Sequence, residues 1–284
     1  MTKNDQHSRI SAEIEKDFES TVLQGLMPGL LHSFANPLNG ILGRSRLLQE
    51  RVKKTIEALN GHNGMGDTIL EGCNGIARDA DLIVRESETF FDLFGKVSRK
   101  MYRLSDATVQ HVNLSELIEA EVAFLEFYLD FRHTIDKRLL LNGNVPDVRG
   151  TYSCYSLSLF ALIRRSIDAM KGDDTGELVI VTDYDDSYVS IDIKDTGKPL
   201  SKVRTKRLFE ALEKENPAAC DLGKDRGFFN ALFLLKSYGG VFKVGCEEKF
   251  NVVSVSIPYK NNRGQSTKRQ GTKRGHLPES FTLL

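Results

Sequence analysis

A histidine and an asparagine lie one helical turn apart in the segment HSFANPLNGI, which covers residues 32–41. The histidine is His32, the asparagine is Asn36, and the proline Pro37 follows directly. A neutral imidazole is a good nucleophile near pH 7, so the segment is a candidate site for chemistry at a histidine. A lone histidine is more often an ordinary surface or core residue, and the rest of the chain must decide between these interpretations.

Residues 25–48 form an amphipathic helix when they are placed at about 100° per residue. One side of this helix carries apolar residues: Leu30, Leu31, Phe34, Leu38, Ile41, Leu42 and Leu48. The other side carries polar and small residues: His32, Asn36, Asn39 and Gly43, with Gly25 and Gly29 close by. A face with so little side-chain bulk around a nucleophile suits the close approach of another protein.

The composition is that of a globular protein, because 40% of the 284 residues are hydrophobic and 27% are charged. This length suggests about two domains. The chain has 39 basic and 39 acidic side chains, which argues against a general nucleic-acid or membrane-surface binder. No apolar run reaches the ~18 residues of a membrane span, and the first residues lack a signal-peptide core, so we expect a cytoplasmic protein. The four cysteines form no CxxC pair, which favours reduced thiols over disulfides or zinc.

The first part of the chain, residues 11–105, has helical periodicity with no strand-like alternation. A glycine-rich connector, GHNGMGD, divides it into two long helices, which predicts an antiparallel hairpin. We expect residues 1–10 to be an N-terminal extension. A lone hairpin buries only part of its apolar face, so pairing with a second copy into a four-helix bundle is the natural completion.

Helical and alternating segments mix in residues 110–260. NLSELIEAEVAFLEFYLDFR (113–132) reads as a helix, and GELVIVTDYDDSYVSIDIKD reads as a β-hairpin. Two further strands, GVFKVGC and NVVSVSIPYK, close this part. The pattern predicts an α+β fold, a two-layer sandwich of helices on a sheet. Residues 261–284 are polar and basic without periodicity, and we expect a disordered tail.

The segment LLHSFANPLNGILGRSRLL resembles the H-box of the dimerisation and phosphotransfer domain of sensor histidine kinases. Four later segments fall where the ATP-binding domain of that family has its entry, adenine, phenylalanine and lid motifs: VNLSELIEAEVAFLE with VPDVRGTYSCYSLSLFALIRRSIDAM, DIKDTGKPLS, RLFEAL and GKDRGFFNALFLLKSYGG. The resemblance spans residues 11–259 and implies a sandwich of the histidine-kinase ATPase type. It also implies that His32 is a phosphoacceptor, whose phosphoramidate passes phosphate readily to a carboxylate.

The resemblance assigns roles to the two residues that follow His32 by about one turn. In related proteins the residue at the position of Asn36 orients a water that hydrolyses the aspartyl phosphate of a partner. Pro37 loosens the helix after the phosphoacceptor, and helix bending is one way in which such bundles change state.

The residues needed for ATP chemistry depart from the family pattern. The base after the histidine is an acid in the family and is Ser33 here, and losing a general base typically costs about 10²–10⁴ in rate. The magnesium-binding asparagine is replaced by Arg165, a cation that repels magnesium and that would contact phosphate directly. Alternatively, Arg165 pairs with Asp168 or Glu210 and never meets a nucleotide.

The nucleotide motifs are altered as well. The adenine box keeps Asp195, which is expected to read the adenine amino group, and Gly197, but its second glycine is Pro199. The lid keeps two glycines around an acid, in the order Gly223, Asp225 and Gly227. The carboxylate would repel phosphates, so we expect no cofactor, and ATP with magnesium only if the chain is an active kinase.

Three hypotheses remain. The first is a histidine phosphotransfer protein, a homodimer that exchanges phosphate with response-regulator receiver domains or a hybrid kinase, with its ATP domain reduced to a docking platform. The second is an active, divergent soluble histidine kinase. The third is a non-catalytic pseudokinase scaffold, in which His32 would be replaceable without effect. The sequence leaves open which transferase activity, if any, is present.

Overall fold

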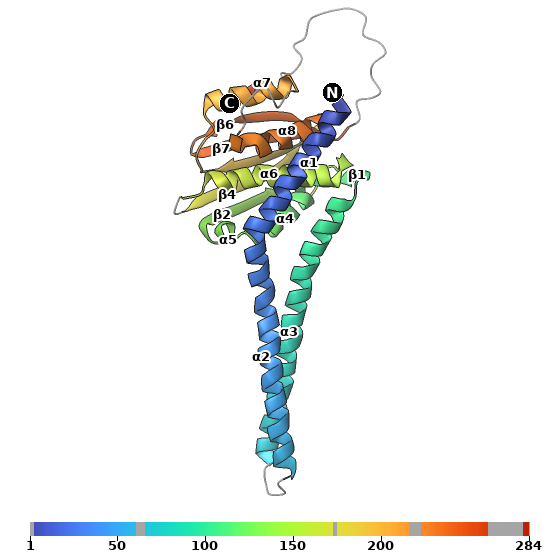
Figure 1. The fold of residues 1–284 in the computed structure, drawn as a ribbon, viewed down its shortest axis with the longest axis vertical. Helices are drawn as coiled ribbons and strands as arrows, with labels where there is room; N and C mark the ends of the chain where they lie inside the picture. Colours follow the sequence, from blue (N-terminus) through green and yellow to red (C-terminus); the bar gives the residue numbers. More distant parts are fainter. Residues whose placement is uncertain (1–2, 61–65, 173–174, 216–222, 261–280, 284) are drawn as a thin grey trace, which may run out of the picture. The chain divides into compact units, whose positions relative to one another are not determined.

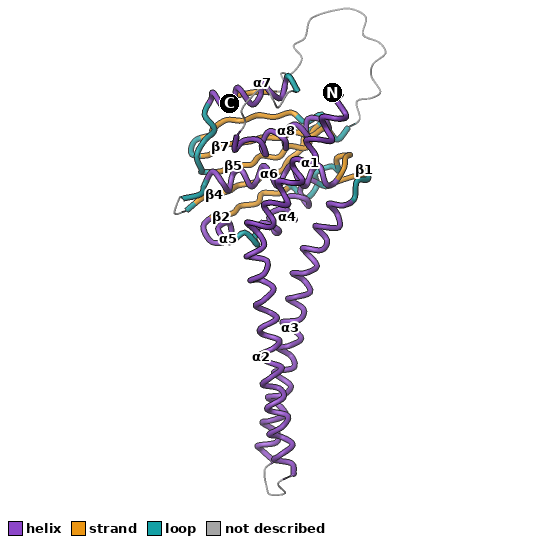
Figure 2. Tube along the Cα trace, viewed as in Figure 1, coloured by secondary structure: helices purple, strands orange, loops and turns teal. Residues whose placement is uncertain are grey.

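The computed structural model describes residues 3–60, 66–172, 175–215, 223–260 and 281–283. The chain divides into two compact units. The hairpin unit is Met27–Tyr102, and the sheet unit combines Met1–Leu26 with Arg103–Leu284. Figures 1 and 2 show long helices in the first and a helix-covered sheet in the second.

The hairpin unit consists of helix α2 (Met27–Asn60) and most of helix α3 (Gly66–Ser105). The rings of Phe34 and Phe90 meet with centroids 5.6 Å apart. Further along α2, Arg51 forms an ion pair of 2.8 Å with Asp79, whose side chain is only 1% exposed. As the residue numbers along α2 increase, those of the contacting residues on α3 decrease. The two helices are therefore antiparallel, and the predicted hairpin is confirmed. Pro37 lies inside α2, and its side chain is buried.

The sheet unit holds a six-stranded mixed sheet of order β2-β4-β5-β7-β6-β8. Its strands are β2 (Ile135–Leu141), β4 (Gly176–Tyr184), β5 (Tyr188–Asp195), β6 (Val241–Glu247), β7 (Phe250–Pro258) and β8 (Phe281–Leu283). Strands β2 and β4 are parallel, as are β6 and β8, and the other pairs are antiparallel. Two short strands, β1 (Val109–Val112) and β3 (Val148–Thr151), form a separate antiparallel pair.

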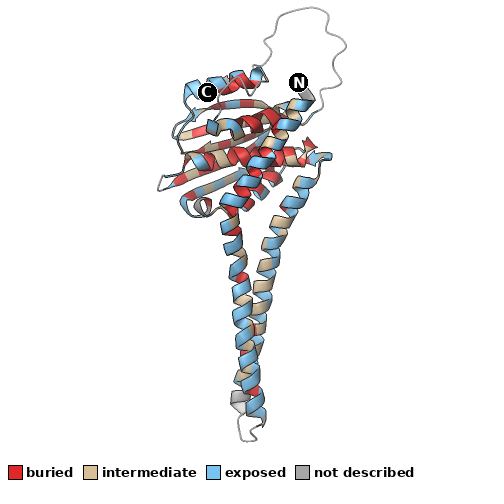
Figure 3. Cartoon of the chain, in the orientation of Figure 1, coloured by how far each residue is buried: buried red, intermediate tan, exposed pale blue. Residues whose placement is uncertain are grey.

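Helices cover one face of this sheet (Figure 1). The helices are α4 (Leu114–Leu125), α5 (Leu129–Thr134), α6 (Tyr152–Ala169), α7 (Lys202–Glu213) and α8 (Arg226–Ser237). Alternation along the strands supplies the buried layer beneath them, because Ile180, Ile191 and Val255 are at most 1% exposed while their neighbours point away. The predicted α+β two-layer sandwich is confirmed, and Figure 3 shows its burial.

Helix α4 begins at a side-chain cap. The Asn113 carboxamide oxygen accepts hydrogen bonds from the backbone N–H groups of Ser115 (3.0 Å) and Glu116 (3.1 Å). The single helix expected over 113–132 is wrong, because the chain turns after Leu125 and starts α5 at Leu129. The backbone N–H of Tyr128 donates to the carbonyl of Leu125 across this turn.

The N-terminal helix α1 (Lys3–Thr21) belongs to the sheet unit, whereas the sequence placed residues from 11 onward in the hairpin. Its apolar stripe of Ile10, Ile14 and Phe18 is buried, and the helix packs on α6 and α8. A π-helical segment, Val22–Leu26, joins it to α2. Helical periodicity shows that a stripe exists but not which surface covers it, which explains the difference.

The C-terminal region was expected to be a disordered tail. Residues 281–283 instead form strand β8, which pairs with Phe242–Val244 of β6. The remaining tail residues, 261–280 and 284, and most of the glycine-rich connector lie outside the described residues.

Candidate functional site

His32 lies on the surface of α2, and so does Asn36 one turn later. Within the described part of the chain, no hydrogen bond or ion pair involves the imidazole, and the next residue along the chain is Ser33. The neighbouring Leu30 is 4% exposed, so the helix has a buried side and the histidine is not on it. The ring is therefore free to meet a partner.

The three glycines near the histidine do not all lie on one open face of the helix. At Gly43 an added Cβ would meet nothing within 4 Å, so this position is open. At Gly25 an added Cβ would lie 2.9 Å from the ring of Tyr128, and Gly29 is buried. The expectation of one docking face built from all three glycines is therefore wrong, and only Gly43 supplies it.

Asp195 ends strand β5 with its side chain fully buried. Its Oδ1 accepts a hydrogen bond of 3.0 Å from the backbone N–H of Gly197 and one of 2.7 Å from Nδ2 of Asn251. Asn251 is the cross-strand partner of Asp195 on β7, and its amide also donates to the carbonyl of Gly197 at 2.7 Å. One oxygen of the carboxylate expected to read an adenine amino group is thus engaged by the chain itself, whereas Oδ2 is buried and has no hydrogen-bond partner among the described residues.

Arg165 projects from α6 toward the same carboxylate. Its Nη1 lies 3.7 Å from Oδ2 of Asp195, and its guanidinium lies 5.5 Å from the ring centroid of Phe228. Burial lowers the pKa of Arg165, and the charge of Asp195 opposes that effect. The alternative pairing with Asp168 or Glu210 is not found among the described residues, because Asp168 pairs with Arg164 and Lys171 instead.

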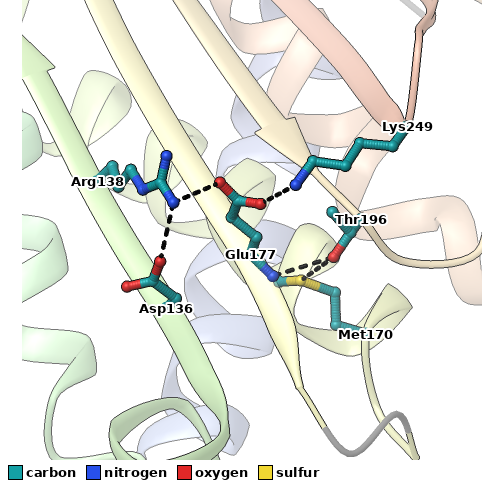
Figure 4. A network of polar contacts seen from close by, with 6 residues as sticks. All are labelled: Asp136, Arg138, Met170, Glu177, Thr196 and Lys249. Atoms are coloured by element: carbon teal, nitrogen blue, oxygen red, sulfur yellow. Dashed lines mark hydrogen bonds and ion pairs between the residues drawn. The ribbon is translucent and has the colours of Figure 1, made fainter.

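The loop after Asp195 is held tightly in place (Figure 4). Thr196 exchanges hydrogen bonds with the backbone of Glu177, whose carboxylate bridges Arg138 and Lys249. These cations keep the pKa of Glu177 below its usual value, with the Lys249 hydrogen bond as the largest cause. At Gly197 an added Cβ would lie 2.4 Å from the backbone carbon of Ala169, so only glycine allows this approach.

The lid residues are engaged within the sheet unit as well. Asp225 forms an ion pair of 2.8 Å with Arg204 of α7, and Gly223 adopts a positive φ of 43° just before it. An added Cβ at Gly227 would lie 3.2 Å from a carboxylate oxygen of Asp17 on α1. Carboxylates of Asp225 and Asp17 thus lie at the lid, and that of Asp225 is paired with Arg204.

A second acid of α1, Glu13, also reaches the start of α8. Its carboxylate lies 3.7 Å from Nη1 of Arg226 and accepts a hydrogen bond of 3.4 Å from Asn230. Sequence reasoning missed Glu13 and Asp17, because acids on an amphipathic helix look like an ordinary solvated face. It also missed Asn251, which has no motif of its own and is identified only by its register on β7.

Among the described residues, no group of three or more His, Cys, Asp or Glu side chains could hold a metal ion. No described helix is long and apolar enough to cross a membrane.

Neither a family model nor a curated protein sequence matches the chain. Several solved histidine kinases are similar in structure at low identity. The catalytic domain of histidine kinase ThkA has 18% identity and a TM-score of 0.45, covering 54% of this chain and 96% of that one. Acinetobacter baumannii histidine kinase AdeS has 14% identity and a TM-score of 0.42, covering 77% and 96%.

A third similar structure is histidine kinase ThkA in complex with response regulator protein TrrA. It has 15% identity and a TM-score of 0.42, and the similarity covers 91% of this chain and 68% of that one. At these identities and TM-scores the similarity carries no inference about activity, so function is inferred below from the residues of the chain itself.

Proposed function

We propose that this chain is a two-component phosphorelay protein that carries phosphate on His32 and has lost ATP-dependent autophosphorylation. A ring nitrogen of His32 attacks the phosphorus of a receiver aspartyl phosphate. The new P–N bond forms as the P–O bond to the aspartate breaks, the aspartate leaves as a carboxylate, and the imidazole proton passes to water. The same steps in reverse deliver the phosphoryl group to a second receiver.

The exposure of His32 supports its part in this exchange. The imidazole and Asn36 are both exposed on α2, and the open position at Gly43 leaves room for a partner on that side. Ser33 cannot accept the imidazole proton at neutral pH, so the chain has no base next to the histidine for attack on ATP. A receiver, by contrast, brings an already activated acyl phosphate.

The loss of ATP chemistry rests chiefly on one observation: a buried cation, Arg165, lies beside Asp195, with its Nη1 3.7 Å from Oδ2. Oδ1 of Asp195 already accepts hydrogen bonds from the chain, so a purine amino group could use only Oδ2, which has no hydrogen-bond partner among the described residues. There the amino group would lie next to the guanidinium, and both groups are hydrogen-bond donors. Around the start of α8, Arg204 and Arg226 are already paired with the carboxylates of Asp225 and Glu13.

We expect no measurable binding of Mg-ATP to the purified full chain by titration calorimetry. The three obstacles act on different parts of the nucleotide: Asn251 on the base, Arg165 on the metal and Asp225 on the phosphates. An affinity in the micromolar range that requires magnesium would instead establish an active divergent kinase. Titration of ATP without magnesium is the matched control, because Arg165 by itself would favour phosphate.

We expect a homodimer that forms through the hairpin unit. Many large apolar side chains of this unit are exposed in the single chain, among them Leu31, Leu38, Leu42, Val52, Ile56, Leu59, Val84, Phe91 and Phe94. Soluble monomers rarely leave so much contiguous apolar surface in water. Light scattering at micromolar concentration should therefore give twice the 31.9 kDa mass of the chain. A monomeric mass would contradict the four-helix bundle.

A further inference from the structure

Residues of α6, α7, β6 and β7 line a cavity of about 440 Å³ in the sheet unit. Its lining residues are Arg165, Leu200, Lys202, Thr205, Val244, Gly245, Cys246, Asn251, Val252 and Val253. Cavities of about 300–1,000 Å³ with a mostly apolar lining and a few polar groups are typical binding sites for organic molecules. The cavity is therefore large enough for a ligand and is built from regular elements.

The charged groups that line this cavity are both cations. They are Arg165 and Lys202, and no carboxylate is among the lining residues. The Arg165 side chain is only 15% exposed, and its nearest carboxylate oxygen, on Asp195, is 3.7 Å away, which is longer than a hydrogen bond. Among the described residues, no hydrogen bond of the guanidinium is found and Lys202 has no ion pair. A largely desolvated guanidinium with unused donors favours an oxyanion as its partner.

The remaining lining determines what kind of anion fits. Leu200, Val244 and Val253 give the cavity an apolar wall, and the two valines are at most 6% exposed. Asn251 donates its amide N–H groups to Asp195 and Gly197, and its carbonyl oxygen accepts from the Cys246 thiol at 3.6 Å. The cavity offers cationic donors and apolar surface, which matches a ligand with an apolar body and an anionic end.

We propose that this cavity binds a small organic anion with an aromatic or branched aliphatic body, without magnesium. Its oxyanion pairs with Arg165 and Lys202, and its body packs against Val244 and Val253. The inference rests on the proposed loss of nucleotide binding, because it assigns the vacated pocket a different chemical class of ligand. Bound there, such an anion supplies the second partner that the Arg165 guanidinium lacks.

The test is titration calorimetry of the full chain with 1-naphthyl phosphate, an aromatic ring system with a phosphate, and with its neutral counterpart 1-naphthol. We expect saturable binding of one naphthyl phosphate per chain, unchanged by magnesium and weakened by salt, and no comparable binding of naphthol. Arg165→Gln should weaken this binding by about tenfold or more, the effect of one lost charged hydrogen-bond pair. Lys202→Gln should weaken it by a smaller factor.

Lys202→Gln keeps the test decisive even if Arg165→Gln disturbs the buried Asp195, because Lys202 is exposed. Lys206→Gln is the matched control, since Lys206 is an exposed residue of the same helix outside the cavity lining, and it should leave the affinity unchanged. Equal binding of naphthol, or equal losses in the Lys202 and Lys206 variants, would overturn the proposal. Magnesium-dependent ATP binding in the same calorimeter would overturn the proposed function instead, so the two failures are distinguishable.

Discussion

Replacement of His32 by alanine should reduce acid-labile labelling from a phosphorylated receiver to background. In the proposed reaction the imidazole forms the P–N bond, and alanine offers no nucleophile in its place. The fold and the oligomeric state should not change, because His32 is exposed and makes no described hydrogen bond or ion pair. The measurement is the radioactivity retained on the protein after transfer, with circular dichroism and light scattering on the same samples.

Two neighbouring variants separate chemistry from docking. Asn36→Ala should leave transfer to His32 largely intact but slow hydrolysis of the receiver phosphate, because Asn36 is proposed to orient water and carries no phosphate. Gly43→Trp should block transfer by bulk alone, since nothing lies within 4 Å of the open position at Gly43. If the His32→Ala protein still accepts label, the histidine is not the phosphoacceptor. If neither the wild type nor any variant accepts label from a receiver, the result would favour the scaffold hypothesis.

Phe18→Ala should lower the free energy of unfolding of the sheet unit by about 3–5 kcal/mol, the usual cost of removing a buried phenylalanine ring. Phe18 is 6% exposed and packs edge-on against Phe160, with ring centroids 4.9 Å apart. Its helix α1 is thus part of the core of this unit rather than a free extension. Urea unfolding followed by tyrosine emission reports on this unit, because the chain has no tryptophan and Tyr102 is the one tyrosine in the hairpin unit.

Leu23→Ala is the matched control for Phe18→Ala. Leu23 lies a few residues further along the same continuous helical segment, but its side chain is 65% exposed. Its truncation should change the free energy of unfolding by no more than about 0.5 kcal/mol. Equal effects of the two substitutions would show that α1 does not pack on α6 and α8 in solution.

Elements with a strong period were predictable from the sequence. The antiparallel hairpin and the β4–β5 pair follow from local patterns that need no knowledge of distant residues. Helix α1 shows the limit of prediction from local patterns. Its apolar stripe of Ile10, Ile14 and Phe18 could be buried in a hairpin as well as against a sheet unit. Strand β8 has only three residues and pairs with β6, which is distant in sequence, so no local periodicity predicts it.

The candidate site divides in the same way. His32 and Asn36 are singled out by the resemblance of their segment to the H-box, and the structure places both on the surface. The state of Asp195 depends on long-range pairing that no motif encodes: the register between β5 and β7 puts Asn251 opposite it. The ion pair between Asp225 and Arg204 likewise joins residues of different elements. Sequence motifs single out the segments around Asp195 and Asp225, but only the tertiary structure shows which of their polar groups pair with other residues.

The central claim is that phosphate reaches His32 from a receiver and not from ATP. In the most direct measurement, a panel of receiver domains is labelled with radioactive acetyl phosphate, purified away from it, and incubated with the wild-type chain. In parallel, the wild-type chain is incubated with radioactive Mg-ATP alone. We predict acid-labile label on the chain from at least one receiver, absent in His32→Ala, and none from Mg-ATP. Label acquired from Mg-ATP without any receiver, and lost in His32→Ala, would contradict this account and establish an autophosphorylating kinase.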